Sequence, residues 1–279
     1  MRVSLIVNPF ASRVTEARLR ELERRLDVVE TLLTERRGHA TELAAAAEGE
    51  AVFVFGGDGV INEVLNGLSA GKPLGIVPGG HTNVLARALG VPRDPAAAVT
   101  ARRISVGRVN GRRFAFAAGI GVDSETVREL ETHKRARNGR RSGDVSYALV
   151  VARRLLRGYA PRLEVESLGR AGIVFVSNDA VYTYAGPLPF RFSPQARFEL
   201  GLDVCAVERI GTLDAGRLVG RIVAGRGLAG AAGVLALHDV NRVRVTCDAP
   251  LPLQADGEDL GDVTDALFEA ERDALDVLV

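Results

Sequence analysis

Short apolar runs that end in glycine-, proline- or asparagine-rich turns alternate with helical patterns along the first part of the chain. The runs predict buried strands and the periodic segments predict helices. We expect strands at 3–7, 28–33, 51–55 and 74–77, and helices at 14–26, 40–47, 60–68 and 84–89. Because strands that alternate with helices are typical of a parallel sheet, residues 1–105 predict an α/β domain.

After residue 105 the pattern changes to apolar strands separated by turns. We expect strands at 103–109, 113–118, 171–176 and 242–246, and one helix at 145–156. Asn110-Gly111 predicts a tight hairpin between two of these strands. Residues 106–279 therefore predict a second, β-rich domain, and the sequence leaves open whether the last strand returns to the first domain.

Composition excludes several classes of protein. The chain has 279 residues, 47% of them hydrophobic, and a net charge of +1, which gives no long-range attraction for nucleic acid. Cys205 and Cys247 are too few for a disulfide framework and predict buried free thiols. The first apolar run stops at Asn8-Pro9, and no run reaches the roughly 18 residues of a membrane span, so we expect a cytoplasmic protein.

Two glycine-rich turns, Gly56–Gly59 and Gly79–Thr82, each follow a predicted parallel strand and precede a helix. Such turns present backbone N–H groups and the positive end of a helix dipole, which bind phosphate. Asp58 would repel a polyphosphate unless a cation lay between them, which favours Mg²⁺. A tight turn with an aspartate cap explains the same residues and stays open. The P-loop pattern is absent, since Lys72 is followed by proline.

The glycine turns form part of a longer series of motifs. The series comprises Asn8-Pro9, the segments 55–68 and 75–87, Gly119–Asp123, Ser177-Asn178, Tyr184–Pro187 and Gln254–Glu258. It resembles the diacylglycerol kinase catalytic-domain family, which includes bacterial lipid kinases and sphingosine kinases. Because the motifs occur in the family's order over nearly the whole chain, the resemblance is specific.

The resemblance implies an ATP site between an α/β domain similar to those of NAD kinases and phosphofructokinases and a C-terminal β-sandwich domain. The ATP of this site would be accompanied by the Mg²⁺ that the charge of Asp58 favours. Glu258 matches the general base, and Asp123 matches an acidic residue near the reacting phosphate. The residues expected along the nucleotide are Asn8, Thr34, Gly56, Gly57, Asp58, Gly59, Val60, Ile61, Asn62, Gly79, Gly80 and Thr82.

Physical chemistry is compatible with these roles, since phosphoryl transfer needs positioning, charge neutralisation and one proton acceptor. Residues 256–259 also have the pattern of a solvated hairpin turn, which stays open as an alternative. The chain departs from the family where Val60 replaces a threonine, and at His81 and Val84. Residues 198–203 lack the paired aspartates that many relatives use for a second magnesium, which leaves that site open.

We therefore expect an ATP-dependent lipid kinase that associates transiently with a membrane surface. The basic segment 133–141 is the candidate for that association. Diacylglycerol is the leading acceptor, with sphingoid bases, phosphatidylglycerol and other polyol lipids open. A kinase of a soluble substrate such as NAD and a non-catalytic nucleotide or lipid sensor are the alternatives. The oligomeric state is open, a homodimer included.

Overall fold

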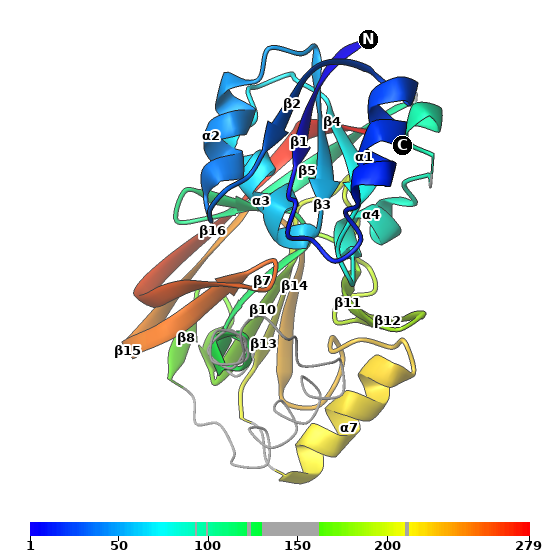
Figure 1. Ribbon diagram of the computed structural model, residues 1–279. Helices are drawn as coiled ribbons and strands as arrows, with labels where there is room; N and C mark the ends of the chain where they lie inside the picture. The colour runs from blue at the N-terminus through cyan, green and yellow to red at the C-terminus, as the bar shows by residue number, and fades with distance from the viewer. Residues whose placement is uncertain (93, 99, 122–123, 130–161, 210–211) are drawn as a thin grey trace. The chain divides into compact units, whose positions relative to one another are not determined.

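The computed structural model describes residues 1–92, 94–98, 100–121, 124–129, 162–209 and 212–279 (Figure 1). The chain packs into two units, Met1–Val106 with Glu271–Val279, and Gly107–Ala270. Glu271–Val279, whose place the sequence left open, therefore packs with the first unit. The assignment of nucleotide binding to residues 1–105, and of a second domain to residues 106–279, stays a prediction.

The first unit is built of alternating strands and helices. Its strands are β1 (Arg2–Val7), β2 (Asp27–Leu33), β3 (Ala51–Gly56) and β4 (Leu74–Pro78), and its helices are α1 (Glu16–Arg25), α2 (His39–Ala46), α3 (Asp58–Gly67), α4 (Val84–Leu89) and the short 3₁₀ helix η1 (Pro95–Ala97). These elements confirm the predicted strands and helices to within a few residues. The Thr15 hydroxyl caps α1 by accepting a hydrogen bond from the Arg18 N–H, and Gly90 ends α4 with a φ of 70°.

The strands of this unit form a parallel sheet in the order β4-β3-β1-β2. The end of β16 (Glu258–Leu278) adds a further parallel strand beside β4, with Val277 opposite Leu74. Helices α2 and α3 cover one face of the sheet, and α1 and α4 cover the other (Figure 1). Because both faces are covered, every residue of β3 is buried, as expected for a parallel strand.

The second unit is mainly antiparallel sheet. Its elements are β6 (Arg112–Phe114), β7 (Ala117–Ile120), β8 (Leu163–Val165), β9 (Gly169–Ala171), β10 (Ile173–Ser177), β11 (Val181–Ala185), β12 (Leu188–Arg191), β13 (Leu202–Val207), β14 (Val234–Val240), β15 (Arg242–Ala255) and the helix α7 (Thr212–Val223). The strand β5 (Ala101–Val109) and β16 each contribute residues to both units. The predicted mixed α/β fold with a β-rich second part is confirmed.

The core of the second unit lies against the sheet β14-β13-β10-β7-β15-β16. Val174 on β10, Val204 on β13 and Phe268 on β16 are fully buried in this core, together with Phe114 on β6. The predicted Asn110-Gly111 hairpin is confirmed, because Val109 pairs with Arg112 and both turn residues have positive φ angles.

Some predictions were incomplete or cannot be compared with the structure. The chain pattern did not predict α7 or the long strand β16. The helix expected at 145–156 and the basic segment 133–141, predicted to meet a membrane, lie outside the described residues. Cys205 is buried and free as predicted, whereas Cys247 is only partly buried, although desolvation raises its pKa to about 11.

The pairing of β16 with β4 predicts that the last strand stabilises the first unit. Val277 is fully buried in it, so Val277→Ser should lower the free energy of unfolding by about 2–4 kcal/mol. Urea unfolding measures this change. Arg272→Ser, at an exposed position of the same strand, should change stability by less than about 0.5 kcal/mol. Equal stability of both variants would contradict the assigned packing.

Candidate active site

The predicted nucleotide residues gather at one edge of the parallel sheet. The chain leaves β1 toward β2 on one side and later returns to β3 on the other, so the strand order reverses between β1 and β3. In open α/β sheets the carboxyl ends of the strands at such a reversal form the ligand crevice. Asn8 follows β1 at this point, and Gly57 follows β3.

The two glycine turns touch each other directly. The Gly79 N–H donates to the Gly56 carbonyl at 2.7 Å, and the Arg13 N–H donates to the Gly79 carbonyl at 2.9 Å. A Cβ on Gly80 would lie 2.6 Å from the Cα of Gly57, and one on Gly79 would lie 3.0 Å from the Cα of Gly56. Side chains at these positions would force the turns apart, so contact between the turns itself requires glycine.

The first turn of α3 has the backbone geometry that an anion site requires. Its N-cap is Gly57, which makes no side-chain capping hydrogen bond. The leading backbone N–H groups of a helix have no intrahelical acceptor, and they lie at the positive end of its dipole. A phosphate could therefore bind at Gly57–Val60 without displacing a side-chain cap.

Asp58 has a structural contact in addition to its predicted metal role. One of its carboxylate oxygens accepts a hydrogen bond from the Leu85 N–H, at 3.3 Å, in the first turn of α4. The carboxylate thus connects the starts of α3 and α4. Among the described residues, no group of three or more His, Cys, Asp or Glu side chains is placed to hold a metal ion. A single carboxylate is still enough for Mg²⁺, which is commonly held by one or two carboxylates together with substrate phosphates.

The side chains that follow Asp58 point into the protein. Val60, Ile61 and Asn62 are each less than 7% exposed. The amide of Asn66 donates to the Asn62 carbonyl at 2.9 Å. The part of this segment best suited to meet a ligand is therefore the backbone of its first turn.

Glu63 is a buried residue that the sequence prediction missed. Its carboxylate accepts hydrogen bonds from the N–H groups of Gly38 and Ala40, at 2.9 and 3.2 Å, and so caps α2. The Thr41 hydroxyl donates to the Glu63 carbonyl. The glutamate in the glycine-turn motif thus ties α2 to α3. No pattern in the sequence indicated this capping role, because Gly38 and Ala40 lie more than 20 positions before Glu63.

The remaining residues predicted for the nucleotide lie at the same strand ends. The Asn8 side chain accepts from the Phe10 N–H at 3.0 Å and shapes the turn after β1. Thr34 is buried after β2, and its N–H donates to the Val7 carbonyl. Thr82 is partly exposed in a turn that Asn83 closes through two hydrogen bonds to the Gly80 backbone, both 2.9 Å.

In the second unit, Glu258 is the first residue of β16. The Arg112 guanidinium donates to its carboxylate at 3.0 Å, and the Glu258 side chain is 15% exposed. This contact restricts the rotamers of the Glu258 side chain. Asp123, the other predicted catalytic residue, lies outside the described residues.

Asp256 has a structural role that the sequence left undecided. Its carboxylate accepts hydrogen bonds from three consecutive backbone N–H groups, those of Ala115, Phe116 and Ala117, at 2.6–3.2 Å. Asp256 and Gly257 also form the two-residue turn between β15 and β16, with φ angles of 50° and 78°. Residues 256–259 therefore form a hairpin turn, but the turn is not fully solvated as that interpretation held, because Asp256 is buried. The Asp256 anchor fixes the position of Glu258 within this unit.

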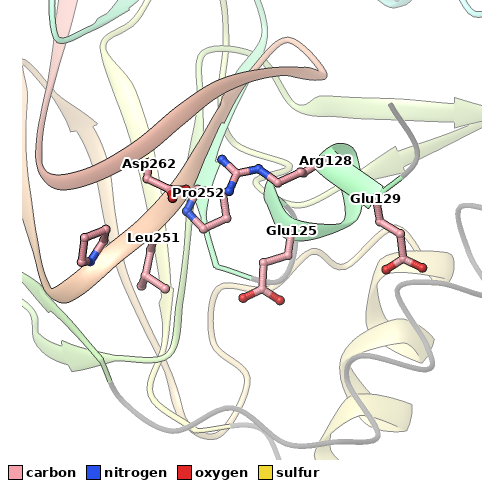
Figure 2. Close-up of a pocket in the computed structure, with 7 residues that line it drawn as sticks. Glu125, Arg128, Glu129, Leu251, Pro252 and Asp262 are labelled. Carbon is pink, nitrogen blue, oxygen red and sulfur yellow. Dashed lines mark hydrogen bonds and ion pairs between the residues drawn. The ribbon is translucent and has the colours of Figure 1, made fainter. Parts of the chain in front are cut away.

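A pocket of about 320 Å³ lies beside the same hairpin (Figure 2). Arg128 forms one wall and donates to Asp259 at 2.7 and 2.9 Å and to Asp262 at 2.6 Å. These bonds, first those to Asp259, raise the pKa of Arg128 above its usual value. Arg128 thereby connects the helical residues 124–129 to the start of β16.

Asp203 lies in the segment that lacks the family's paired aspartates. Its carboxylate binds His238 Nδ1 at 2.7 Å and the Asp239 N–H at 3.1 Å. Burial raises the pKa of Asp203, which these two contacts oppose. The carboxylate is thus occupied by protein groups that join β13 to β14.

Comparison with known proteins bears directly on this geometry. Residues 2–110 match the diacylglycerol kinase catalytic domain. The resemblance inferred from the motifs is confirmed, and the matched range contains both glycine turns and Asn8.

Individual relatives extend the similarity for part of their length. The chain is 44% identical over 102 residues to a diacylglycerol kinase of Bacillus subtilis, which covers 33% of this chain and 34% of that protein. It is 33% identical over 153 residues to a diacylglycerol kinase of Staphylococcus saprophyticus, covering 47% and 50%. The matches thus span a third to a half of these curated relatives.

Solved structures share the fold over nearly the whole chain. A diacylglycerol kinase structure from Bacillus anthracis has a TM-score of 0.72 and 23% identity, covering 99% of this chain and 96% of that one. An NAD kinase from Archaeoglobus fulgidus in complex with ATP has a TM-score of 0.52 and 11% identity, covering 100% and 94%. At these identities the likeness concerns the fold alone.

The Asp256 anchor predicts a large stability effect in the second unit. Asp256→Ala would leave three buried N–H groups without their acceptor and should cost about 3–5 kcal/mol. Asp265→Ala removes a carboxylate of the same hairpin that is 46% exposed and 3.6 Å from Arg244, and should cost less than about 1 kcal/mol. Thermal and urea unfolding of both variants test the difference. A loss for Asp256→Ala no larger than that for Asp265→Ala would show that the anchor is unimportant.

Proposed function

We propose that this chain is an ATP-dependent lipid kinase that phosphorylates a lipid hydroxyl, with diacylglycerol as the leading acceptor. The observation that supports this most strongly is the match of residues 2–110 to the diacylglycerol kinase catalytic domain, with two touching glycine turns at the carboxyl ends of β3 and β4, beside the reversal point of the sheet. The kinship supports a kinase of this class, and the acceptor is our proposal.

The nucleotide would bind through backbone groups more than through side chains. We assign the phosphates to the N–H groups of the first turn of α3 and to the neighbouring turn Gly79–Thr82. Asn8 and Thr34 would line the same edge of the sheet. Mg²⁺ fits Asp58 and would neutralise charge on the polyphosphate when bound.

Glu258 is the proposed proton acceptor. In the transfer, the lipid hydroxyl oxygen forms a bond to the terminal phosphorus, the bond from that phosphorus to the ADP oxygen breaks, and the hydroxyl proton passes to the Glu258 carboxylate. The hydrogen bond from Arg112 would orient this carboxylate before the reaction. Asp123 is proposed as the acidic residue near the phosphate.

A substrate test separates this proposal from its alternatives. We expect the protein to transfer labelled phosphate from ATP to a component of a lipid extract, giving a product that partitions into organic solvent, with diacylglycerol as the best single acceptor. Mass spectrometry of the labelled band identifies the lipid. A product that stays in water with NAD as acceptor would support a soluble-substrate kinase. ATP binding without any phosphorylated product would support a sensor.

Two substitutions test the assigned chemistry. Glu258→Gln should lower kcat by about 10²- to 10⁴-fold with little change in the KM for ATP, because it removes only the proton acceptor. Asp58→Asn should also lower turnover and should raise the Mg²⁺ concentration that is required.

Asp265→Asn is the matched control, because Asp265 is an exposed carboxylate on the strand of Glu258, and it should leave turnover unchanged. Circular dichroism verifies that each variant is folded. Normal turnover in folded Glu258→Gln would remove that residue from the mechanism.

A further inference from the structure

A group of exposed apolar side chains lies on α7 and β12 in the second unit. Leu188 is 64% exposed on β12, and Val219 and Val223 are 44% and 67% exposed on α7. The helix lies near β12 (Figure 1), and the Leu228 N–H after the helix donates to the carbonyl of Phe192 at 2.8 Å. We call Leu188, Val219 and Val223, together with the arginines named below, the α7 surface.

The exposed valines do not belong to the packed side of the helix. Ala215 and Leu218 are buried and form that side. Val219 and Val223 are four residues apart and therefore lie on one face, which also carries Gly216 and Gly220. A Cβ on either glycine would meet none of the described residues within 4 Å, so the described part of the chain leaves this face open. The helix thus presents apolar residues in two directions, although only one is needed for folding.

Positive charge borders the exposed valines. The Arg217 side chain is 79% exposed, and Arg226 is exposed just after the helix. Asp214 approaches Arg217 only to 4.0 Å and is itself 53% exposed. Arg221 instead holds the turn after the helix by donating to the carbonyls of Gly227 and Ala229. The pattern of apolar residues flanked by arginine is that of a helix that lies in a membrane interface.

We propose that the α7 surface docks on an anionic lipid bilayer, with its apolar side chains inserted and Arg217 and Arg226 at the headgroups. The proposal rests on the proposed function, in which the acceptor is a membrane lipid. A second copy of the chain fits this face less well. Symmetric pairing of this face would place Arg217 and Arg226 of one copy near the same arginines of the other. Asp214 of each copy would offset only part of their repulsion.

Vesicle sedimentation tests the docking surface. We expect the unaltered protein to bind vesicles of phosphatidylcholine and phosphatidylglycerol more tightly than vesicles of phosphatidylcholine alone. Leu188→Ser with Val219→Ser and Val223→Ser should weaken binding to the mixed vesicles by about tenfold or more. Arg217→Ser with Arg226→Ser should remove most of the preference for phosphatidylglycerol and its salt dependence.

Matched controls come from the first unit. Leu33 is 49% exposed, and the Arg20 side chain is 68% exposed, so Leu33→Ser and Arg20→Ser remove similar groups elsewhere. Both should leave vesicle binding unchanged. Vesicle binding by the α7-surface variants equal to that of the unaltered protein would overturn the proposal. So would a mass by light scattering that falls from dimer to monomer in the apolar variant while vesicle binding stays the same, since the occupant would then be a second copy.

A short-chain diacylglycerol dispersed below its micellar concentration separates docking from catalysis. The α7-surface variants should phosphorylate it at the normal rate while losing binding to the mixed vesicles. If the unaltered protein phosphorylates this lipid but binds neither kind of vesicle, the docking proposal is wrong and the proposed function stands. If it binds the mixed vesicles through the α7 surface but phosphorylates no lipid, the docking proposal stands and the proposed function is wrong.

Discussion

The contact between the two glycine turns is the constraint on which the candidate nucleotide site depends. Gly56 and Gly57 approach Gly79 and Gly80 so closely that no side chain fits between them. This contact brings the starts of α3 and α4 together, where Asp58 bonds to the backbone of Leu85. A site made of backbone groups at two helix ends requires that the two helices begin close together. The glycines allow this, because they have no side chains to hold the turns apart.

Each unit contains a buried carboxylate that is bonded to backbone N–H groups close to a predicted functional residue. Glu63 holds the start of α2, and Asp256 holds the segment 115–117 beside the β15–β16 turn. In each case the buried charge is compensated by several donors, which makes its position well defined. The residue proposed for chemistry lies nearby in sequence, Asp58 before Glu63 and Glu258 after Asp256. Each acidic motif thus pairs a carboxylate that holds several backbone N–H groups with the residue to which we assign chemistry.

Local patterns predicted the first unit well. Its strands are short, apolar and separated by glycine turns, so β1, β3 and β4 and the helices after them follow from hydrophobic periodicity. The strand β16 was missed because its alternation is irregular and its ends serve different units. The helix α7 was missed because Gly216 and Gly220 weaken its helical propensity. The motif resemblance indicated the candidate residues, but not the tertiary contacts that give Glu63, Asn83 and Asp256 their roles.

The position of Glu271–Val279 has a consequence for how the protein is made. The strand order of the first unit is complete only when this segment pairs with β4, yet more than 190 residues separate the two along the chain. During translation the edge of β4 therefore emerges from the ribosome long before its partner does. At typical synthesis rates of about 5–20 residues per second, that edge would wait on the order of ten seconds or more with no partner strand for its backbone groups. The nascent first unit should therefore be a substrate for chaperones until the final strand arrives.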